Sequence, residues 1–271
     1  MKRNIFRVLL LIGLFFYLPF QSKAWGVLGH RIVGEIADKY VNATARAKIR
    51  TILGTESIAM ASNWADFIKS DSSFRYLNSW HYINLDSGLS YNNVKDYLKN
   101  DTATDVYTKI NFLVKELKNK KLPKDKKLFY LRLLIHFVGD VHQPMHVSRK
   151  SDLGGNTIKV LWFSEPSNMH RVWDENLIES QQLSYTEYAT AINHPGISLR
   201  KKWQTQPMVD WFYESYEISE QLHTEIKQPN QRLGYEYNFD HIETLNRRLL
   251  QGGVRLAALL NKIFDNESVD F

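Results

Sequence analysis

Apolar residues recur at helical spacing along most of this chain. In the segment 30–41, for example, Ile32, Val33 and Ile36 fall on one face of a helix. The last predicted helix, at about 240–264, is the longest, and its Gly252-Gly253 pair marks a point of close packing or a kink. The same spacing predicts the remaining helices at about 43–53, 57–69, 103–118, 126–142, 169–180, 185–193 and 208–227.

Strand signals are scarce by comparison. The best is the run Thr157–Phe163, which follows a Gly-Gly-Asn turn at 154–156 and fits a small hairpin. No internal repeat, low-complexity linker or shift in composition divides the sequence. The pattern therefore predicts a single all-α domain with at most a small β-hairpin near 157–163.

The first 24 residues have the pattern of a secretory signal peptide. A basic start (2–7) precedes an apolar run (9–20), and Ser22-Lys23-Ala24 supplies the small residues of a cleavage site. The apolar run is too short for a comfortable membrane span, which argues against an anchor. We therefore predict cleavage after Ala24, a mature domain of residues 25–271 with no membrane span, and export to the periplasm or the medium.

Cleavage changes the charge of the protein. The whole chain has 35 basic and 29 acidic residues. Removing the four basic residues of the signal segment leaves 31 basic residues against 29 acidic ones, a net charge of about +2. Composition therefore gives no support for a broad basic surface that binds nucleic acid. A polyanion would have to be attracted by local charge, of which bound metal cations are one source.

Two blocks of the sequence share a His-x-x-x-Asp spacing, His136 to Asp140 and His170 to Asp174. Residues four apart lie on one face of a helix, so each block directs an imidazole and a carboxylate to one point. Zinc takes this mixture of ligands, and the absence of cysteine excludes thiolate sites. Because Pro144 ends the helix of the first block, His146 lies beyond the break and is free to point elsewhere. The pattern predicts metal chemistry.

Three further ligand-type residues stand beside or near a tryptophan: His30, Asp66 and His81. Taken singly, each is more often a surface group or a structural residue than a ligand. Together with the two matched blocks they favour one metal site assembled from distant segments. The remaining histidines lack such partners in the sequence, and we expect them to be structural or exposed: His142, His194, His223 and His241.

The motifs, taken in order, resemble those of a known family. They are Trp-Gly-x-x-Gly-His from Trp25, Trp-Ala-Asp, His-Tyr-Ile, His-Phe-x-Gly-Asp-x-x-Gln-Pro-x-His, Gly-Gly-Asn, His-x-x-Trp-Asp and Gly-Gly-x-Arg-Leu-Ala, and they span the mature chain. The chain is similar to the zinc-dependent single-strand nucleases of the S1/P1 type, which also act as 3′-nucleotidases. These enzymes share the helical fold of bacterial zinc phospholipase C, and the resemblance implies that fold here.

The resemblance implies three zinc ions per chain. The implied ligands are Asp66, His81, His136 and Asp140 for the first ion; His30, the amino group and carbonyl oxygen of Trp25 and a bridging Asp140 for the second; and His146, His170 and Asp174 for the third. An amide nitrogen has no lone pair to give a metal, so the Trp25 ligand would exist only after the signal peptide is removed.

The resemblance also implies the reaction. Zinc-activated water would hydrolyse single-stranded RNA or DNA to 5′-phosphorylated products, without a nucleophilic side chain. Asp66, Asp140 and Lys69 would be the catalytic residues. Lys69 occupies the position of a family arginine or lysine that neutralises the phosphoryl group, although lysine cannot form the bidentate fork of arginine.

Four positions are implied to bind the substrate. Tyr82 and Leu153 would hold a base between them, and Asn156 would bond to the nucleoside. A paired base cannot enter such a slot without leaving its stack, which favours single strands. Many relatives have aspartate where this chain has Asn84, and because an amide both donates and accepts, we expect a broader or shifted base preference.

Two other functions remain open from the sequence. A zinc phospholipase C shares the fold and the ligand set, and a non-catalytic zinc-binding helical protein would hold the metal without hydrolysis. Nonspecific nucleic-acid binding without catalysis is weakened by the small net charge. The implied partners are single-stranded nucleic acid and 3′-nucleotides as substrates, and no stable protein partner is indicated.

Overall fold

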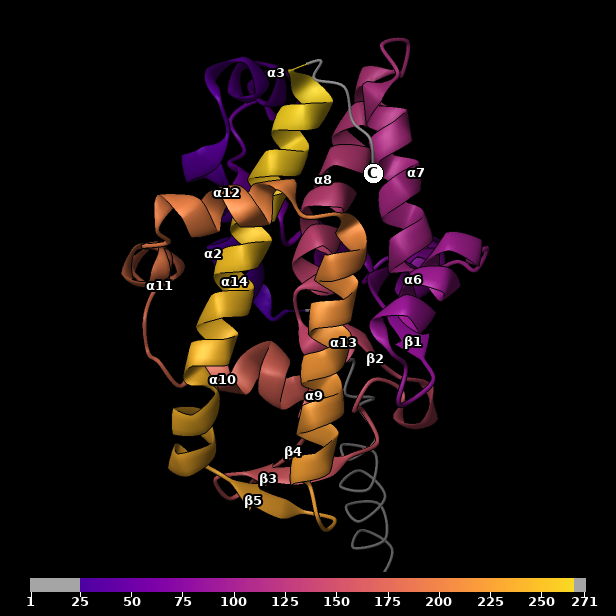
Figure 1. Cartoon of the computed structure of the whole chain (residues 1–271). Helices are drawn as coiled ribbons and strands as arrows, with labels where there is room; N and C mark the ends of the chain where they lie inside the picture. The colour runs from indigo at the N-terminus through magenta and orange to yellow at the C-terminus, as the bar shows by residue number, and fades with distance from the viewer. Residues whose placement is uncertain (1–24, 266–271) are drawn as a thin grey trace, which may run out of the picture.

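The computed structural model describes residues 25–265, and it is mainly helical, as the periodicity predicts. The long helices α8, α13 and α14 run along the length of the molecule (Figure 1). The α-helices are α2 (Val27–Tyr40), α3 (Ala43–Leu53), α4 (Ile58–Ala61), α5 (Trp64–Ile68), α6 (Tyr91–Asn100), α7 (Val106–Lys118), α8 (Lys124–Val141), α9 (Met169–Arg171), α10 (Leu177–Glu179), α11 (Tyr185–Ile192), α12 (Ile197–Thr205), α13 (Met208–Glu225) and α14 (Tyr235–Phe264). The other helical segments are the 3₁₀ turns η1 (Ser72–His81), η2 (Pro144–His146) and η3 (Lys150–Asp152) and the π-helical turn η4 (Val172–Asn176).

Within residues 25–265, five helical segments are not predicted by the periodicity: η1, α6 and α12, and the three-residue turns η2 and η3. Their apolar content is low. In α6 only Val94 and Leu98 are buried, and in α12 only Trp203 is. A short helix that buries one or two side chains leaves too weak an apolar pattern to recognise.

The predicted hairpin is present, but it is not the only β-structure. Strands β3 (Lys159–Trp162) and β4 (Glu165–Asn168) are antiparallel neighbours, and β5 (Gln231–Leu233) joins β3 in parallel. Strands β1 (Ile83–Leu85) and β2 (Val147–Arg149) form a second, parallel pair. Strands of three residues carry no alternation that the sequence could reveal.

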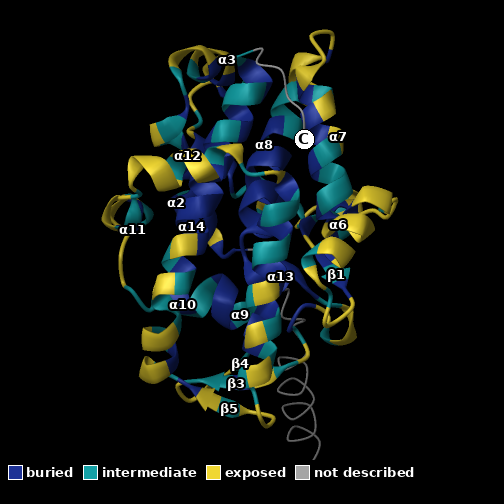
Figure 2. Ribbon diagram, in the orientation of Figure 1, coloured by how far each residue is buried: buried dark blue, intermediate teal, exposed yellow. Residues whose placement is uncertain are grey.

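The core lies between α14 and its neighbours α2, α8 and α12. Buried residues follow the inner sides of α8 and α14, whereas exposed residues gather at loops and helix ends (Figure 2). The predicted close approach at Gly253 is real, because a Cβ there would lie 2.5 Å from the Cβ of Ile36 on α2. All residues from Leu133 to Val141 are buried, so α8 carries His136 and Asp140 into the centre of the protein.

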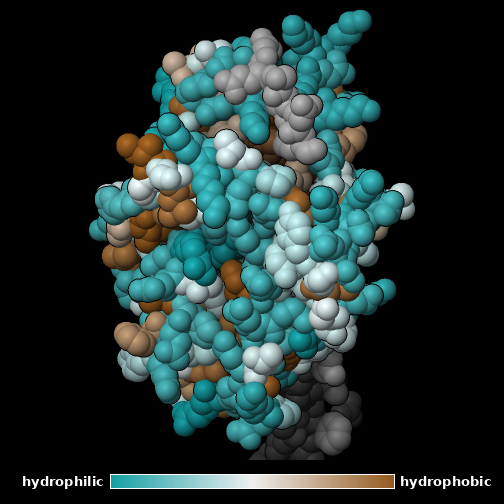
Figure 3. All heavy atoms as spheres, viewed as in Figure 1, coloured by the Kyte–Doolittle hydropathy of each residue, from teal (hydrophilic) through white to brown (hydrophobic). Residues whose placement is uncertain are grey.

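The surface seen in Figure 3 is mostly hydrophilic, with hydrophobic residues in small separate patches. None of the helices within residues 25–265 combines the length and hydrophobicity needed to cross a membrane. The predicted signal segment, residues 1–24, lies outside the described residues, so its cleavage stays a prediction.

Candidate metal centre and substrate pocket

Asp140 is the centre of a buried cluster of predicted ligands. Its Oδ1 lies 3.3 Å from His30 Nε2. Its Oδ2 lies 3.0 Å from His81 Nδ1 and 3.3 Å from His136 Nε2. Asp66 completes the group, with its Oδ1 3.8 Å from His136 Nε2. Residues separated by more than 100 positions along the chain are thus brought within reach of one carboxylate.

A glycine of α8 lets α2 approach this cluster. A Cβ at Gly139 would lie 2.8 Å from His30 Nδ1, so any larger residue would displace that ring. The Gly139 carbonyl oxygen accepts a hydrogen bond of 2.6 Å from the Trp25 indole, which is fully buried. On the other side the amide of Gly26 donates to the carbonyl oxygen of Asp174 at 2.8 Å. The backbone at residue 25 therefore lies between the two ligand-bearing segments, although its role as a ligand stays a prediction.

His146, His170 and Asp174 form a second cluster. The carboxylate of Asp174 lies 3.1 Å from His170 Nε2 and 3.5 Å from His146 Nε2. The Nδ1 atoms face backbone carbonyl oxygens, that of His81 for His146 and that of Gly154 for His170. Each Nδ1 therefore carries the proton and each Nε2 turns its lone pair inward. His146 Nδ1 lies 3.7 Å from Asp140 Oδ1, so the two clusters are adjacent.

The atoms that face the two clusters suit metal cations. A buried polar atom without a hydrogen bond is costly and needs an explanation. Within residues 25–265, seven such atoms belong to the predicted ligands: Nδ1 and Nε2 of His30, Nε2 of His81, His146 and His170, Oδ1 of Asp140 and Oδ2 of Asp174. The imidazole and carboxylate donors fit zinc.

Among the described residues, three trios have ligand atoms within 4.8 Å of one another: His30 with Asp66 and His136, His81 with His136 and Asp140, and His146 with His170 and Asp174. The last trio is the predicted third set, and the second trio belongs to the predicted first set. Only the first trio mixes the predicted first and second sets, because His30 lies near Asp66 as well as Asp140.

Burial keeps the imidazoles of the first cluster uncharged. It lowers the pKa values of His30 and His81 well below the usual range, and the nearby cationic groups lower them further. It also lowers the pKa of His136, to about 4. Burial raises the pKa of Asp140 strongly, and the charge of Asp66 adds to this effect. Neutral imidazoles keep a lone pair for a cation, and a cation would in turn favour the ionised carboxylate.

In the second cluster the carboxylate of Asp174 is ionised. Burial raises the pKa of Asp174, but the charge of His170 and the hydrogen bonds of both histidines outweigh it and hold the pKa at about 2. Burial lowers the pKa of His170, but the charge of Asp174 outweighs it, so that the net shift is upward. The ionised Asp174 thus attracts positive charge to this point, as a bound divalent cation would supply.

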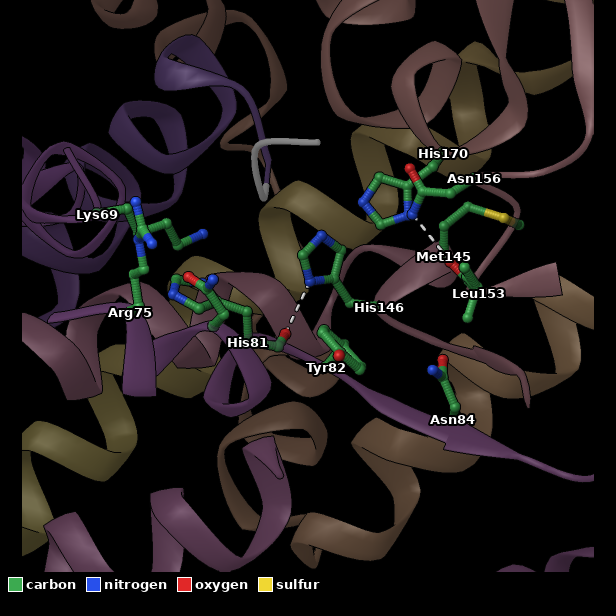
Figure 4. Close-up of a pocket in the computed structure, with 11 residues that line it drawn as sticks. Lys69, Arg75, His81, Tyr82, Asn84, Met145, His146, Leu153, Asn156 and His170 are labelled. Carbon is green, nitrogen blue, oxygen red and sulfur yellow. Dashed lines mark hydrogen bonds between the residues drawn. The ribbon is translucent and has the colours of Figure 1, made fainter. Parts of the chain in front are cut away.

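A cavity of about 380 Å³ opens onto both clusters. The four predicted substrate residues line it together with the predicted catalytic Lys69, and they are Tyr82, Asn84, Leu153 and Asn156. Figure 4 shows Lys69 on one side and Leu153 with Asn84 on the other, with Tyr82 and the histidines between them. Tyr82 is 40% exposed and Leu153 is 61% exposed, so both offer apolar surface to a ligand.

A family profile described as S1/P1 Nuclease matches residues 25–265. The chain belongs to the S1/P1 nuclease family. It is similar to Endonuclease 2 of Arabidopsis thaliana, with 29% identity over 96% of this chain and 97% of that one. It is also similar to Nuclease P1 of Penicillium citrinum, with 26% identity over 90% and 99%. The resemblance seen in the motifs is confirmed, and the protein is a nuclease, a hydrolase that acts on nucleic acid.

The sequence does not reveal every residue around the cavity of this S1/P1 family nuclease. Arg75, Asn78 and Met145 also line it. Arg75 and Asn78 lie on η1, which the periodicity does not predict. The one feature of the sequence that could have indicated a role at the site is the positive charge of Arg75, which lies between two ligand motifs. Met145 stands inside the longest motif, and its sulfur would lie 2.7 Å from a Cβ at Gly155.

Two of the histidines expected to be structural or exposed lie beside carboxylates in this nuclease. His223 lies 2.7 Å from Asp152, and His241 lies 2.9 Å from Glu225. These carboxylates are too distant in the sequence for spacing to show the pairing. His142 is structural, as expected, because its buried ring bonds to the Val138 carbonyl oxygen.

Proposed function

We propose that this chain is an exported trinuclear-zinc phosphodiesterase. It hydrolyses single-stranded RNA and DNA to 5′-phosphorylated fragments and also acts as a 3′-nucleotidase. The single observation that carries the proposal is the set of seven buried ligand atoms within residues 25–265 that have no hydrogen bond. Three of the residues that supply them, His81, His146 and His170, line the substrate cavity. The names of the similar nucleases support the substrate class.

The ligand sets follow the prediction from the motifs. Asp66, His81, His136 and Asp140 would hold the first ion, His30 and the backbone of Trp25 with Asp140 the second, and His146, His170 and Asp174 the third. Bound zinc supplies a Lewis acid for phosphoryl oxygens and lowers the pKa of water to near neutrality. Burial of the site keeps bulk water away, which strengthens every charge interaction in it.

The side chains at the cavity would place the substrate. Lys69 offers a positive charge, balanced by Asp66 at 2.7 Å, to the phosphoryl oxygens. Tyr82 and Leu153 offer the two faces of a base slot, and stacking of this kind accepts every base. Asn84 and Asn156 would bond to the edge of the nucleoside. A base in a duplex must unpair before it enters such a slot, so single strands are preferred.

Removal of residues 1–24 would complete the metal centre. The free amino group of Trp25 becomes a ligand only after cleavage, and its indole is already fixed against Gly139. We predict that a chain extended by a few residues before Trp25 retains about one zinc ion fewer than the mature chain. Metal analysis of both forms tests this, and equal zinc content with equal activity contradicts it.

Substrate assays test the proposed reaction. The purified mature protein is given single-stranded DNA, single-stranded RNA, duplex DNA, 3′-nucleotides and phosphatidylcholine vesicles. We expect cleavage of both single strands with 5′-phosphate ends, release of phosphate from 3′-nucleotides, and much slower attack on duplex. Preferential hydrolysis of the phospholipid would instead support a phospholipase C.

A further inference from the structure

The loop that carries Leu153 and Asn156 has an unusual backbone. Leu153, Gly154 and Gly155 have φ values of 55°, 65° and 77°, so three consecutive residues are left-handed. This conformation is unfavourable for leucine, which has a Cβ, and persists only where surrounding contacts impose it. The position of Leu153 at the cavity therefore depends on what holds the loop.

The inner half of the loop is held by the metal centre. The Gly154 carbonyl oxygen accepts a hydrogen bond of 2.8 Å from His170 Nδ1. A Cβ at Gly154 would lie 2.5 Å from the Met145 carbonyl oxygen, so the backbone packs tightly there. This side of the loop is anchored on a predicted zinc ligand.

The outer half is held by a buried ion pair with α13. One oxygen of Asp152 accepts from the Gly155 amide at 2.7 Å, and the other faces His223 Nε2 at 2.7 Å. The Nδ1 of His223 lies 2.6 Å from the Ser219 carbonyl oxygen. The two side chains are only 4% and 13% exposed. Helix α13 lies alongside β2, the strand that leads into this loop (Figure 1).

Both ring nitrogens of His223 face acceptor oxygens, the arrangement in which a doubly protonated ring donates to both. Burial raises the pKa of Asp152, but the bonds from His223 and Gly155 outweigh it and hold the pKa below its usual value. The other charged groups here are Arg149 on β2 and Glu220 on α13, which pair with each other at 2.5 Å.

We propose that His223, acting through Asp152, is a positioning residue for the base slot. The inference rests on the proposed function, because it concerns how Leu153 and Asn156 are presented to a nucleobase. The Asn156 side chain donates to the Leu153 carbonyl oxygen at 2.8 Å, which ties it to the backbone that carries Leu153. Loss of the ion pair frees this part of the loop, while the bond from His170 Nδ1 to the Gly154 carbonyl oxygen keeps the inner half on the metal centre.

A comparison of two substrates tests the positioning role. In His223→Phe, KM for a short single-stranded oligonucleotide rises about tenfold, the effect of losing most of one stacking contact. Zinc content and hydrolysis of bis(p-nitrophenyl) phosphate, which has no base, change less than twofold. The matched control is His241→Phe, which removes the similar pair with Glu225 and leaves both substrates unaffected.

A conservative variant separates positioning from folding. In Asp152→Asn the amide oxygen still accepts from Gly155, and its nitrogen donates to an uncharged His223 ring, so KM for the oligonucleotide stays low.

The outcomes are distinguishable. If the wild type cleaves no single-stranded nucleic acid, the proposed function itself fails. If the wild type cleaves single-stranded nucleic acid but His223→Phe has the same oligonucleotide KM as His241→Phe, the positioning role is wrong and the proposed function stands. Equal losses on both substrates in His223→Phe also overturn it, because they indicate general damage to the metal centre.

Discussion

Lys69 stands between the buried metal cluster and the substrate cavity. Its ammonium lies 2.7 Å from Asp66 Oδ1, and its side chain also lines the cavity. The negative charge on a transferring phosphoryl group grows in the transition state, so a fixed cation at this point stabilises that state more than the bound substrate.

We predict that Lys69→Met lowers kcat about 100-fold, the usual effect of removing one charge-stabilising donor, with little change in KM. Zinc content stays the same, because Lys69 is not a ligand. Lys69→Arg keeps the charge and most of the activity. Steady-state kinetics with metal analysis measure these effects, and a Lys69→Met enzyme with wild-type kcat would rule out the role.

At the residue scale, the motifs predicted which side chains meet. Tyr82 and Asn84 come shortly after the predicted ligand His81 in the sequence. All four substrate residues that the family resemblance implies line the cavity. Arg75 was missed because no motif includes it. The pairing of Asp152 with His223 was missed because it depends on how α13 packs against a distant loop, and spacing along the chain does not encode such packing.

At the scale of elements, α8 and its ending shape the site. The helix ends at Val141, and Pro144 begins η2, which carries His146 to the second cluster. The sequence predicted this break from the proline alone. It did not predict η1, which delivers His81, because the 3₁₀ turns bury only two of their side chains.

Gly139 tests the packing of α8 against α2. We predict that Gly139→Ala displaces His30, since the new Cβ would lie 2.8 Å from its Nδ1. The expected results are loss of about one zinc ion per chain after dialysis and destabilisation of about 1–3 kcal/mol, typical of overpacking. Gly196→Ala is the control, because no atom lies within 4 Å of its Cβ position. Full zinc binding by Gly139→Ala would contradict the ligand role of His30.

At the scale of the whole molecule, a buried charge network joins three long helices beneath the site. Glu214 on α13 pairs with Arg248 at 2.6 Å and with Arg255 at 2.7 Å, both on α14. Arg248 also donates to the His142 carbonyl oxygen at the end of α8. Arg255 belongs to the last motif of the sequence, Gly-Gly-x-Arg-Leu-Ala. This arginine therefore stabilises the packing of the helices and does not line the cavity.

The pH dependence of stability tests this network. Burial raises the pKa of Glu214, but the hydrogen bond from Arg255 and the charges of both arginines outweigh it and hold the pKa below its usual value. The pair therefore stabilises the fold above about pH 4.5 and loses this contribution as the pH falls through the folded-state pKa. We predict that Glu214→Gln lowers the free energy of unfolding by about 2–4 kcal/mol at pH 7, and that its difference from the wild type is smaller at acidic pH. Denaturant unfolding at several pH values measures the difference, and a constant difference would contradict the role of the charge.

The central claim is that three zinc ions perform the hydrolysis. The most direct measurement removes the metal from the mature protein with a chelator and returns zinc in steps, while bound zinc and single-stranded DNA hydrolysis are followed together. We predict that hydrolysis stops on chelation and returns fully only as the bound zinc approaches three ions per chain. Hydrolysis that continues unchanged in the metal-free protein would contradict the claim.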